Sequence, residues 1–209
     1  MTPRALLLDA MGTLIGLRSP LGSTYAAAAA RHGLTVTAAA VDRAFPAVLR
    51  TAPPLAFPGL AGPLLEQAEC RWWGDRIDAT LAACGAGPAP EALHRELFEA
   101  FADPALWRVY DDVPQAMERW HRRGLRLAVV SNFDQRLPGL LEGLGLRPWL
   151  ETVVISSTAG AAKPSPVPFQ QALAALALEA EQVWHVGDSD EDVLGAAAAG
   201  IQAVRIRRR

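Results

Sequence analysis

Polar side chains follow several apolar runs of this sequence, at the points where strands are expected to end. They are Asp9, the pair Ser131 and Asn132, Lys163, and Asp188 with Asp192. An aspartate after a strand is more often a helix cap or a turn former, so no single one of these groups is informative. At the carboxyl edge of one parallel sheet, however, carboxylates beside a lysine could attack an electrophile covalently and hold a hard cation. The ordered combination therefore predicts an active site assembled from distant segments.

Short apolar runs that alternate with helical patterns provide the elements that must position these groups. Such runs are typical of strands buried on both faces of a sheet. Strands are expected at residues 6–9, 125–130, 153–156, 183–186 and 203–206. Helices are expected at residues 113–123, 135–144, 166–178 and 191–199, and three of them end at a glycine. This order predicts an α/β fold with a doubly wound, five-stranded parallel sheet and helices on both faces.

A long insertion follows the first strand. Candidate helices lie within it at residues 23–32, 38–49, 64–84 and 91–102, separated by segments rich in proline and glycine. An insertion of this size is too long for a loop and predicts a helical cap over the carboxyl edge of the sheet. We therefore expect a core domain formed by residues 1–16 and 108–209, and a cap domain formed by residues 17–107.

Composition and charge exclude several classes of protein. The 209 residues, 51% hydrophobic and 20% charged, are typical of a globular chain with one core and an insertion. A formal net charge of -2 gives no reason to expect nucleic acid or an anionic membrane as a partner, and the arginines at residues 205–209 are interpreted as a solvated tail. Cys70 and Cys84 lack the spacing of a disulfide framework or a zinc site and are expected to be reduced and buried.

The sequence pattern predicts neither a membrane span nor a signal peptide. No stretch approaches the roughly 20 apolar residues of a membrane span, and the apolar run at residues 5–8 is far shorter than that of a signal peptide. A cytoplasmic location is therefore expected.

The order of the polar segments resembles the four motifs of the haloacid dehalogenase superfamily. Residues 9–14, DAMGTL, match the first motif, DxxGT, and residues 130–132 match the second, an apolar strand ending in Ser or Thr. Lys163-Pro164 matches the third motif, and residues 187–192, GDSDED, match the fourth, GDxxxD. The cap follows the first motif, as in the C1-capped branch. The resemblance implies a Rossmann-like core and a hydrolase activity.

The resemblance also implies roles in phosphoryl transfer. Asp9 would be the nucleophile that attacks a phosphorylated small molecule, and Lys163 would pair with Asp9 and with the phosphate. Phosphate oxygens would accept hydrogen bonds from Thr13, Ser131 and Asn132.

A Mg²⁺ cofactor is implied in the same way. A carboxylate must approach a dianionic phosphate, and a counter-charge is needed to offset their repulsion in a partly desolvated site. The expected ligands are Asp9, the backbone carbonyl of Met11, Asp188 and Asp192, the last either directly or through a bound water.

Met11 departs from the pattern of most phosphatases in the superfamily. They have at this position an aspartate that protonates the leaving alcohol and then activates water, whereas a thioether cannot transfer protons. General acid–base catalysis commonly contributes about 10² to 10⁴ in rate. Unless the cap supplies an acid or a base, ordinary phosphate monoesters are therefore expected to be hydrolysed weakly, and acyl or aryl phosphates best.

Two other functions stay open. The first motif also resembles that of 2-haloacid dehalogenases, DAYGTL, although dehalogenases carry a tyrosine where Phe169 stands and an asparagine-containing fourth motif in place of the acidic residues from Gly187 to Asp192. The missing acid–base residue is also compatible with a catalytically weak binding or interaction module.

Within the superfamily, the chain resembles the subgroup of haloacid-dehalogenase-like hydrolase domain-containing protein three and the rhythmically expressed gene two protein. The resemblance rests on residues 19–22, Tyr25, Trp72-Trp73, residues 124–134 and residues 185–188. Structural roles are expected for the other conspicuous side chains: Asp134 as a helix cap, Asp190 in a solvent-facing turn, Arg136 on the surface, and Trp72 and Trp73 in packing between cap helices. No site role is assigned to the cap residues Arg43, Arg50, Glu66, Arg71 and Arg76.

Overall fold

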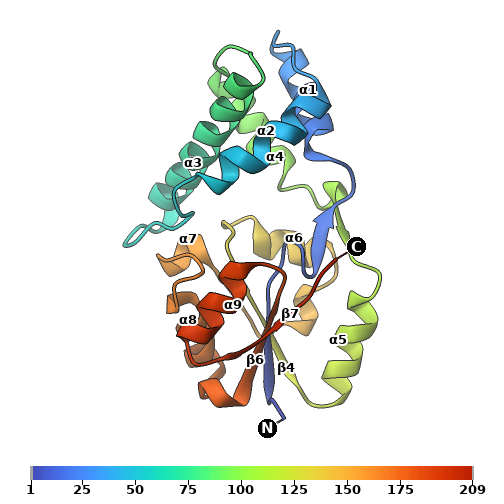
Figure 1. The fold of residues 1–209 in the computed structure, drawn as a ribbon, viewed down its shortest axis with the longest axis vertical. Helices are drawn as coiled ribbons and strands as arrows, with labels where there is room; N and C mark the ends of the chain where they lie inside the picture. The colour runs from blue at the N-terminus through green and yellow to red at the C-terminus, as the bar shows by residue number, and fades with distance from the viewer. Residues whose placement is uncertain (1, 209) are drawn as a thin grey trace.

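A parallel sheet of five strands forms the lower half of the molecule in Figure 1. The computed structural model describes residues 2–208. The strands are β1 (Ala5–Leu8), β4 (Arg126–Ser131), β5 (Thr152–Ile155), β6 (Val183–Gly187) and β7 (Gln202–Arg205), in the spatial order β5-β4-β1-β6-β7. Each lies within one residue of its predicted range, and the predicted α/β fold with a five-stranded parallel sheet is confirmed.

Helices cover both faces of this sheet. They are α5 (Val113–Arg122), α6 (Leu137–Gly143), α7 (Ser156–Ala159), α8 (Val167–Leu176) and α9 (Asp190–Ala198), with short 3₁₀ turns at Pro104–Leu106, Arg147–Trp149 and Ala180–Gln182. Successive residues of a strand point to opposite faces. Leu6 and Leu8 accordingly pack in one apolar cluster, and Ala5 and Leu7 in another on the other face. Burial on both faces explains why β1 is a continuous apolar run.

The inserted residues form four helices that lie above the carboxyl ends of the strands (Figure 1). We call them the cap helices: α1 (Leu21–Arg31), α2 (Ala38–Arg50), α3 (Gly62–Ala83) and α4 (Glu91–Ala100). They surround an apolar cluster of their own, which includes Tyr25, Val41, Ile77, Leu93 and Leu97. All four helices were expected from the sequence, whereas the domain limits 17–107 stay a prediction.

A two-stranded antiparallel ribbon connects the cap helices to the sheet. Its strands are β2 (Ile15–Leu17) and β3 (Trp107–Val109), and Gly16 pairs with Arg108. The sequence analysis missed both strands, because three residues are too few to show a period. A Cβ on Gly16 would lie 2.6 Å from the Tyr110 hydroxyl oxygen, so a larger residue here would force the Tyr110 side chain to shift.

Buried polar contacts join the cap helices to the core. Asp134 is completely buried; it accepts a 2.6 Å hydrogen bond from Trp73 Nε1 and forms a 2.6 Å ion pair with Arg136. Arg136 also donates to the Phe98 carbonyl of α4 at 2.8 Å. The predictions of Asp134 as a helix cap and Arg136 as a surface residue are therefore wrong. No side chain caps α6, and the buried carboxylate needs the guanidinium as its counter-charge.

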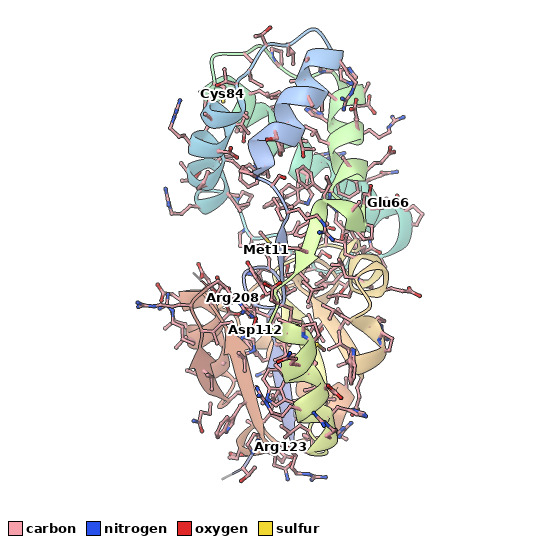
Figure 2. All side chains as sticks on the ribbon, turned by 90° about the vertical axis from the view of Figure 1, so that its right-hand side faces the viewer. Met11, Glu66, Cys84, Asp112, Arg123 and Arg208 are labelled. Atoms are coloured by element: carbon pink, nitrogen blue, oxygen red, sulfur yellow. The ribbon has the colours of Figure 1, made fainter. Side chains whose placement is uncertain are left out.

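The C-terminal arginines were predicted to be a solvated tail. Arg205 is exposed as expected, whereas Arg208 is half-buried, so the prediction is wrong for Arg208. Arg205 pairs with Asp190 and donates from Nε to the Asp188 carbonyl at 3.2 Å. Arg208 pairs with Asp112 (Figure 2), and it donates to the Thr13 carbonyl. Asp190 is exposed as expected, although it begins α9 rather than lying in a turn.

Two further predictions concern cysteines and membranes. Cys70 and Cys84 are unpaired, as expected, but they are half-buried instead of fully buried. Within residues 2–208, no helix combines the length and the apolar character that a membrane crossing needs.

Replacing Arg136 by methionine should strongly destabilise the fold. The variant keeps the packing of the side chain but leaves Asp134 buried without a counter-charge, which costs about 3–5 kcal/mol. We expect the free energy of unfolding, measured by urea titration, to fall by that amount. Arg95→Met is the matched control, because Arg95 forms an exposed pair with Glu91, and such pairs contribute roughly 0–1 kcal/mol. Equal losses in both variants would contradict this account.

Candidate active site

Lys163 lies at the centre of the polar groups predicted from the sequence. Its ammonium nitrogen is 2.6 Å from Asp9 Oδ1 and 2.5 Å from Asp192 Oδ1, and it donates to the Val130 carbonyl at 3.1 Å. These three acceptors use all three hydrogens of the ammonium group. Burial alone would lower the pKa of Lys163, but the charges of Asp9 and Asp192 raise it above its ordinary value. The lysine is therefore held as a cation between two carboxylates.

The first and fourth motifs touch each other through glycines. Gly12 has a φ of +85°, and a Cβ there would lie 2.5 Å from Asp188 Oδ2. A Cβ on Gly187 would lie 2.2 Å from Cγ of Asp192. Glycine is required at both positions because a side chain would displace a carboxylate of the site.

Three carboxylates meet beside Lys163. Asp9, Asp188 and Asp192 each offer one oxygen, and these oxygens lie within 4.8 Å of one another. Burial, and then repulsion by Asp9 and Asp192, raises the pKa of Asp188 above its usual range. A divalent cation with oxygen ligands would relieve this repulsion, so the cluster could hold such an ion.

Asp192 is already engaged on both carboxylate oxygens. Oδ1 contacts Lys163 and, at 2.9 Å, Nε2 of His185, while Oδ2 accepts from the backbone N–H and the hydroxyl of Ser189 at 3.1 and 2.8 Å. Burial alone would raise the pKa of Asp192, but the contacts with His185 and Lys163 hold it well below its usual range. These contacts agree better with the second predicted role, in which Asp192 orients a water bound to the metal.

The residues predicted to bind phosphate also lie here, but they contact groups of the site itself. Ser131 Oγ donates to Asp9 Oδ1 at 3.1 Å, and Thr13 Oγ1 donates to Asp188 Oδ1 at 3.4 Å. The Asn132 side chain accepts from the Lys163 N–H at 2.7 Å and donates to the Lys163 carbonyl at 3.0 Å. Asn132 therefore fixes the backbone of the lysine, and phosphate binding by these residues stays a prediction.

The sequence analysis missed His185 and Ser189. His185 is completely buried in β6, and its ring packs edge-on against Phe169, with the ring centroids 4.9 Å apart. Ser189 is the N-cap of α9 and forms a capping box with Asp192. The spacing Ser-x-x-Asp before a helix could have indicated the capping role, whereas His185 carries no such signal.

A cavity of about 790 Å³ lies between the cap helices and the sheet. Met11, Asn132 and Lys163 contribute to its wall, and so do Trp72 and Trp73 of α3. Met11 is 44% exposed and lies where the cap meets the core (Figure 2). The two tryptophans were expected to pack between cap helices. They instead line the cavity, and Trp73 also donates to the core residue Asp134.

Comparisons with known proteins agree with the motifs and the fold. A family model described as haloacid dehalogenase-like hydrolase matches residues 3–200. The human protein Haloacid dehalogenase-like hydrolase domain-containing protein 3 is 39% identical over 190 residues, which cover 89% of this chain and 74% of the human protein. Phosphoserine phosphatase of Thermus thermophilus is 38% identical over 129 residues, covering 59% of this chain and 50% of that protein.

Solved structures share the fold at low sequence identity. L-2-haloacid dehalogenase of Xanthobacter autotrophicus, with chloropropionic acid covalently bound, superposes with a TM-score of 0.73 at 19% identity. The match covers 98% of this chain and 78% of the dehalogenase. At this identity the likeness shows the fold alone.

The fold and the four motifs thus define a hydrolase with a Rossmann-like core. The chain belongs to the haloacid dehalogenase-like hydrolase family, and its resemblance to the subgroup of domain-containing protein 3 is confirmed.

Adding Mg²⁺ should raise the melting temperature of the protein. A ligand that binds only the folded state stabilises it by RT ln(1 + [L]/Kd), or about 2.7 kcal/mol at a hundredfold excess over Kd. We expect a saturable rise in differential scanning fluorimetry, and its loss in Asp188→Asn. Asp190→Asn is the matched control, because its exposed carboxylate lies outside the cluster of three. An equal shift in wild type and Asp188→Asn would show that the ion binds elsewhere.

Proposed function

We propose that the protein is a Mg²⁺-dependent phosphohydrolase that acts on a phosphorylated small molecule through an aspartyl-phosphate intermediate on Asp9. The observation that carries this proposal is the contact of Asp9 with the Lys163 ammonium at 2.6 Å, next to the carboxylates of Asp188 and Asp192. A lysine and a cation site beside one carboxylate provide the counter-charge that a phosphate needs.

The two oxygens of Asp9 differ in their surroundings. Oδ1 accepts from Lys163 and Ser131, whereas no side chain in residues 2–208 donates to Oδ2. Oδ2 therefore attacks phosphorus, the bond from phosphorus to the leaving oxygen breaks, and that oxygen departs with the electron pair. Water then attacks the same phosphorus, the bond from phosphorus to Asp9 Oδ2 breaks, and its electron pair restores the carboxylate; the protons of the water leave with inorganic phosphate and solvent.

Hard oxygen donors fit Mg²⁺, and the donor set here is made of carboxylates. When bound, the ion neutralises charge on the phosphate oxygens and so lowers the repulsion felt by Asp9. Asp9 and Asp188 would hold it, with the Met11 carbonyl as a further ligand. Lys163 would provide a second positive charge at the site, because its ammonium lies 2.6 Å from Asp9 Oδ1.

Met11 limits which substrates react quickly. Met11 lines the cavity and follows Asp9 by two residues in the chain, and its thioether can neither give nor take a proton. The leaving oxygen must therefore depart unprotonated. Acyl and aryl phosphates are favoured as substrates, because their leaving groups are stable as anions.

Dehalogenation is the second candidate, favoured by the similarity of the first motif. Two observations oppose it: Phe169 brings no hydroxyl and is completely buried against His185, and Asp188 adds a carboxylate next to the nucleophile. Halide release from 2-chloropropionate without added metal, lost in Asp9→Asn, would favour dehalogenation. A binding module without catalysis is the third candidate, and turnover that depends on Asp9 would eliminate it. The cytoplasmic location stays a prediction.

Replacing Asp9 by asparagine should abolish hydrolysis of p-nitrophenyl phosphate and of acetyl phosphate. The amide is a poor nucleophile, so we expect a loss of at least about 10³ in kcat, together with loss of activity in the wild-type enzyme when EDTA removes the metal. Phosphate release by purified protein provides the measurement, and Asp190→Asn, which changes an exposed carboxylate, is the control. Activity that survives in Asp9→Asn would refute the covalent mechanism.

Replacing Met11 by aspartate should introduce the missing proton donor. Met11 is 44% exposed, so a carboxyl group there can stay hydrated and the fold should tolerate it. We expect kcat/KM for alkyl phosphates to rise about 10²-fold, while acetyl phosphate changes little, because general acid–base catalysis acts on the poor leaving group. Met11→Asn is the matched control, since it is polar and similar in size but transfers no proton. A similar gain in Met11→Asn would mean that polarity alone limits the wild-type enzyme.

A further inference from the structure

The wall of the cavity that Asn132 and Lys163 help to line consists mainly of carbon. Aromatic side chains that line it include Tyr25, Phe45, Trp72, Trp73, Phe98 and Phe101. A volume of about 790 Å³ is in the range of pockets that enclose small organic molecules. We propose that this cavity binds the leaving group of the substrate, and that the leaving group is a bulky, uncharged aromatic alcohol, so that the substrate is an aryl phosphate. This inference rests on the proposed phosphohydrolase function.

The geometry of the rings suits an aromatic ligand. Trp72 and Trp73 lie edge to face, with centroids 4.8 Å apart and an interplanar angle of 78°. Trp72 is fixed by a 3.0 Å hydrogen bond to the Pro53 carbonyl, and Trp73 by its bond to Asp134. Rings held in this way offer a preorganised face to another ring, and aromatic pairs contribute beyond the area that they bury.

The charged groups of the wall have partners or face water. Arg136 forms an ion pair with Asp134 and donates a hydrogen bond to the Phe98 carbonyl. The Lys163 ammonium donates its three hydrogens to Asp9, Asp192 and the Val130 carbonyl. The other charged side chains of the wall, Arg50 and Glu191, are exposed. A carboxylate or ammonium on the leaving group would therefore be desolvated in the aromatic part without a counter-charge, which is costly. The aromatic part of the cavity therefore disfavours a leaving group that carries a charge.

Tyr25 adds one neutral polar group. It is only 2% exposed and lines the cavity. Burial raises the pKa of Tyr25 far above its usual range, so the hydroxyl stays protonated and can donate. An uncharged oxygen on the leaving group would accept a hydrogen bond from the Tyr25 hydroxyl.

The lack of a proton donor at Met11 independently favours an aromatic alcohol as the leaving group. Attack of Asp9 breaks the bond between phosphorus and the ester oxygen, and this oxygen receives the electron pair with no proton from Met11. A phenolate is far more stable than an alkoxide, because the ring delocalises its charge. The chemistry at the bottom of the cavity and the aromatic wall above it therefore both favour an aryl ester.

Two isosteric probes test the proposal. 4-Isobutylphenyl phosphate and 4-(carboxymethyl)phenyl phosphate have similar size and para-alkyl phenol leaving groups, but only the second carries a carboxylate. Binding is measured on Asp9→Asn by quenching of tryptophan fluorescence, and turnover on the wild-type enzyme with Mg²⁺. We expect the isobutyl compound to bind at least about tenfold more tightly and to have the higher kcat/KM.

A pair of leucine variants locates the effect. Leu49 of α2 lines the cavity and is 41% exposed, whereas Leu64 of α3 is 63% exposed and lies outside it. Leu49→Lys places a hydrated ammonium at the cavity, which attracts the carboxylate of the second probe, and should reduce the preference for the isobutyl compound several-fold. Leu64→Lys makes the same change on the cap surface and should leave the preference unchanged, which controls for the change in net charge.

The outcomes separate this inference from the proposed function. Equal binding of the two probes, or tighter binding of the carboxymethyl compound, overturns the inference of an uncharged leaving group, while turnover of either probe that is absent in Asp9→Asn still supports a phosphohydrolase. A preference for the isobutyl compound in binding, without any turnover, overturns the phosphohydrolase and leaves the apolar ligand class supported. A preference in both measurements that falls in Leu49→Lys alone supports both.

Discussion

The buried ammonium group of Lys163 is the contact on which the arrangement of this site depends. It lies between Asp9 and Asp192, and without it three carboxylates would face one another at the edge of the sheet. Removing a lysine from water is costly, and the cost is offset only because every hydrogen of the ammonium has an acceptor. Asn132 holds the lysine backbone from both sides, so the second and third motifs are locked in one geometry. In the proposed function, the charge that permits the carboxylates to assemble is also the charge that a phosphate would meet.

Much of this arrangement could be predicted from the sequence. Strands buried on both faces produce continuous apolar runs, and polar residues that follow such runs meet at one edge, so Asp9, Ser131, Lys163 and Asp188 could be grouped before the structure was seen. Asp134 and Arg136 could not, because their roles arise from contacts with α3 and α4, which local patterns do not encode. The same holds for the C-terminal arginines: a run of like charges resembles a solvated tail unless its distant partners are known. The roles of these residues are determined by tertiary contacts and not by local sequence propensity.

The cap helices give the site two kinds of surroundings. Toward the core they contribute hydrogen bonds, through Trp73 to Asp134 and through Glu69, which accepts from Gln135 at 3.1 Å. Toward the cavity they contribute aromatic rings. Trp73 contributes in both directions, since its indole N–H donates a hydrogen bond to Asp134 of the core while its ring lines the cavity. The side chain that orients the cap is thus also part of the surface that a substrate meets, so substrate recognition and cap placement are physically linked.

The long sequence separations within the site have a consequence for biosynthesis. Asp9 is 122 residues from Ser131 and 154 from Lys163, and the carbonyl of Thr13 meets an arginine 195 residues further along the chain. A ribosome adds roughly 5–20 residues per second, so Asp9 leaves the exit tunnel many seconds before its partners are made. During that interval the carboxylate is solvated and β1 has no neighbouring strand. The site of a nascent chain therefore cannot assemble until the last third of the sequence has been translated, and it appears together with the completed sheet.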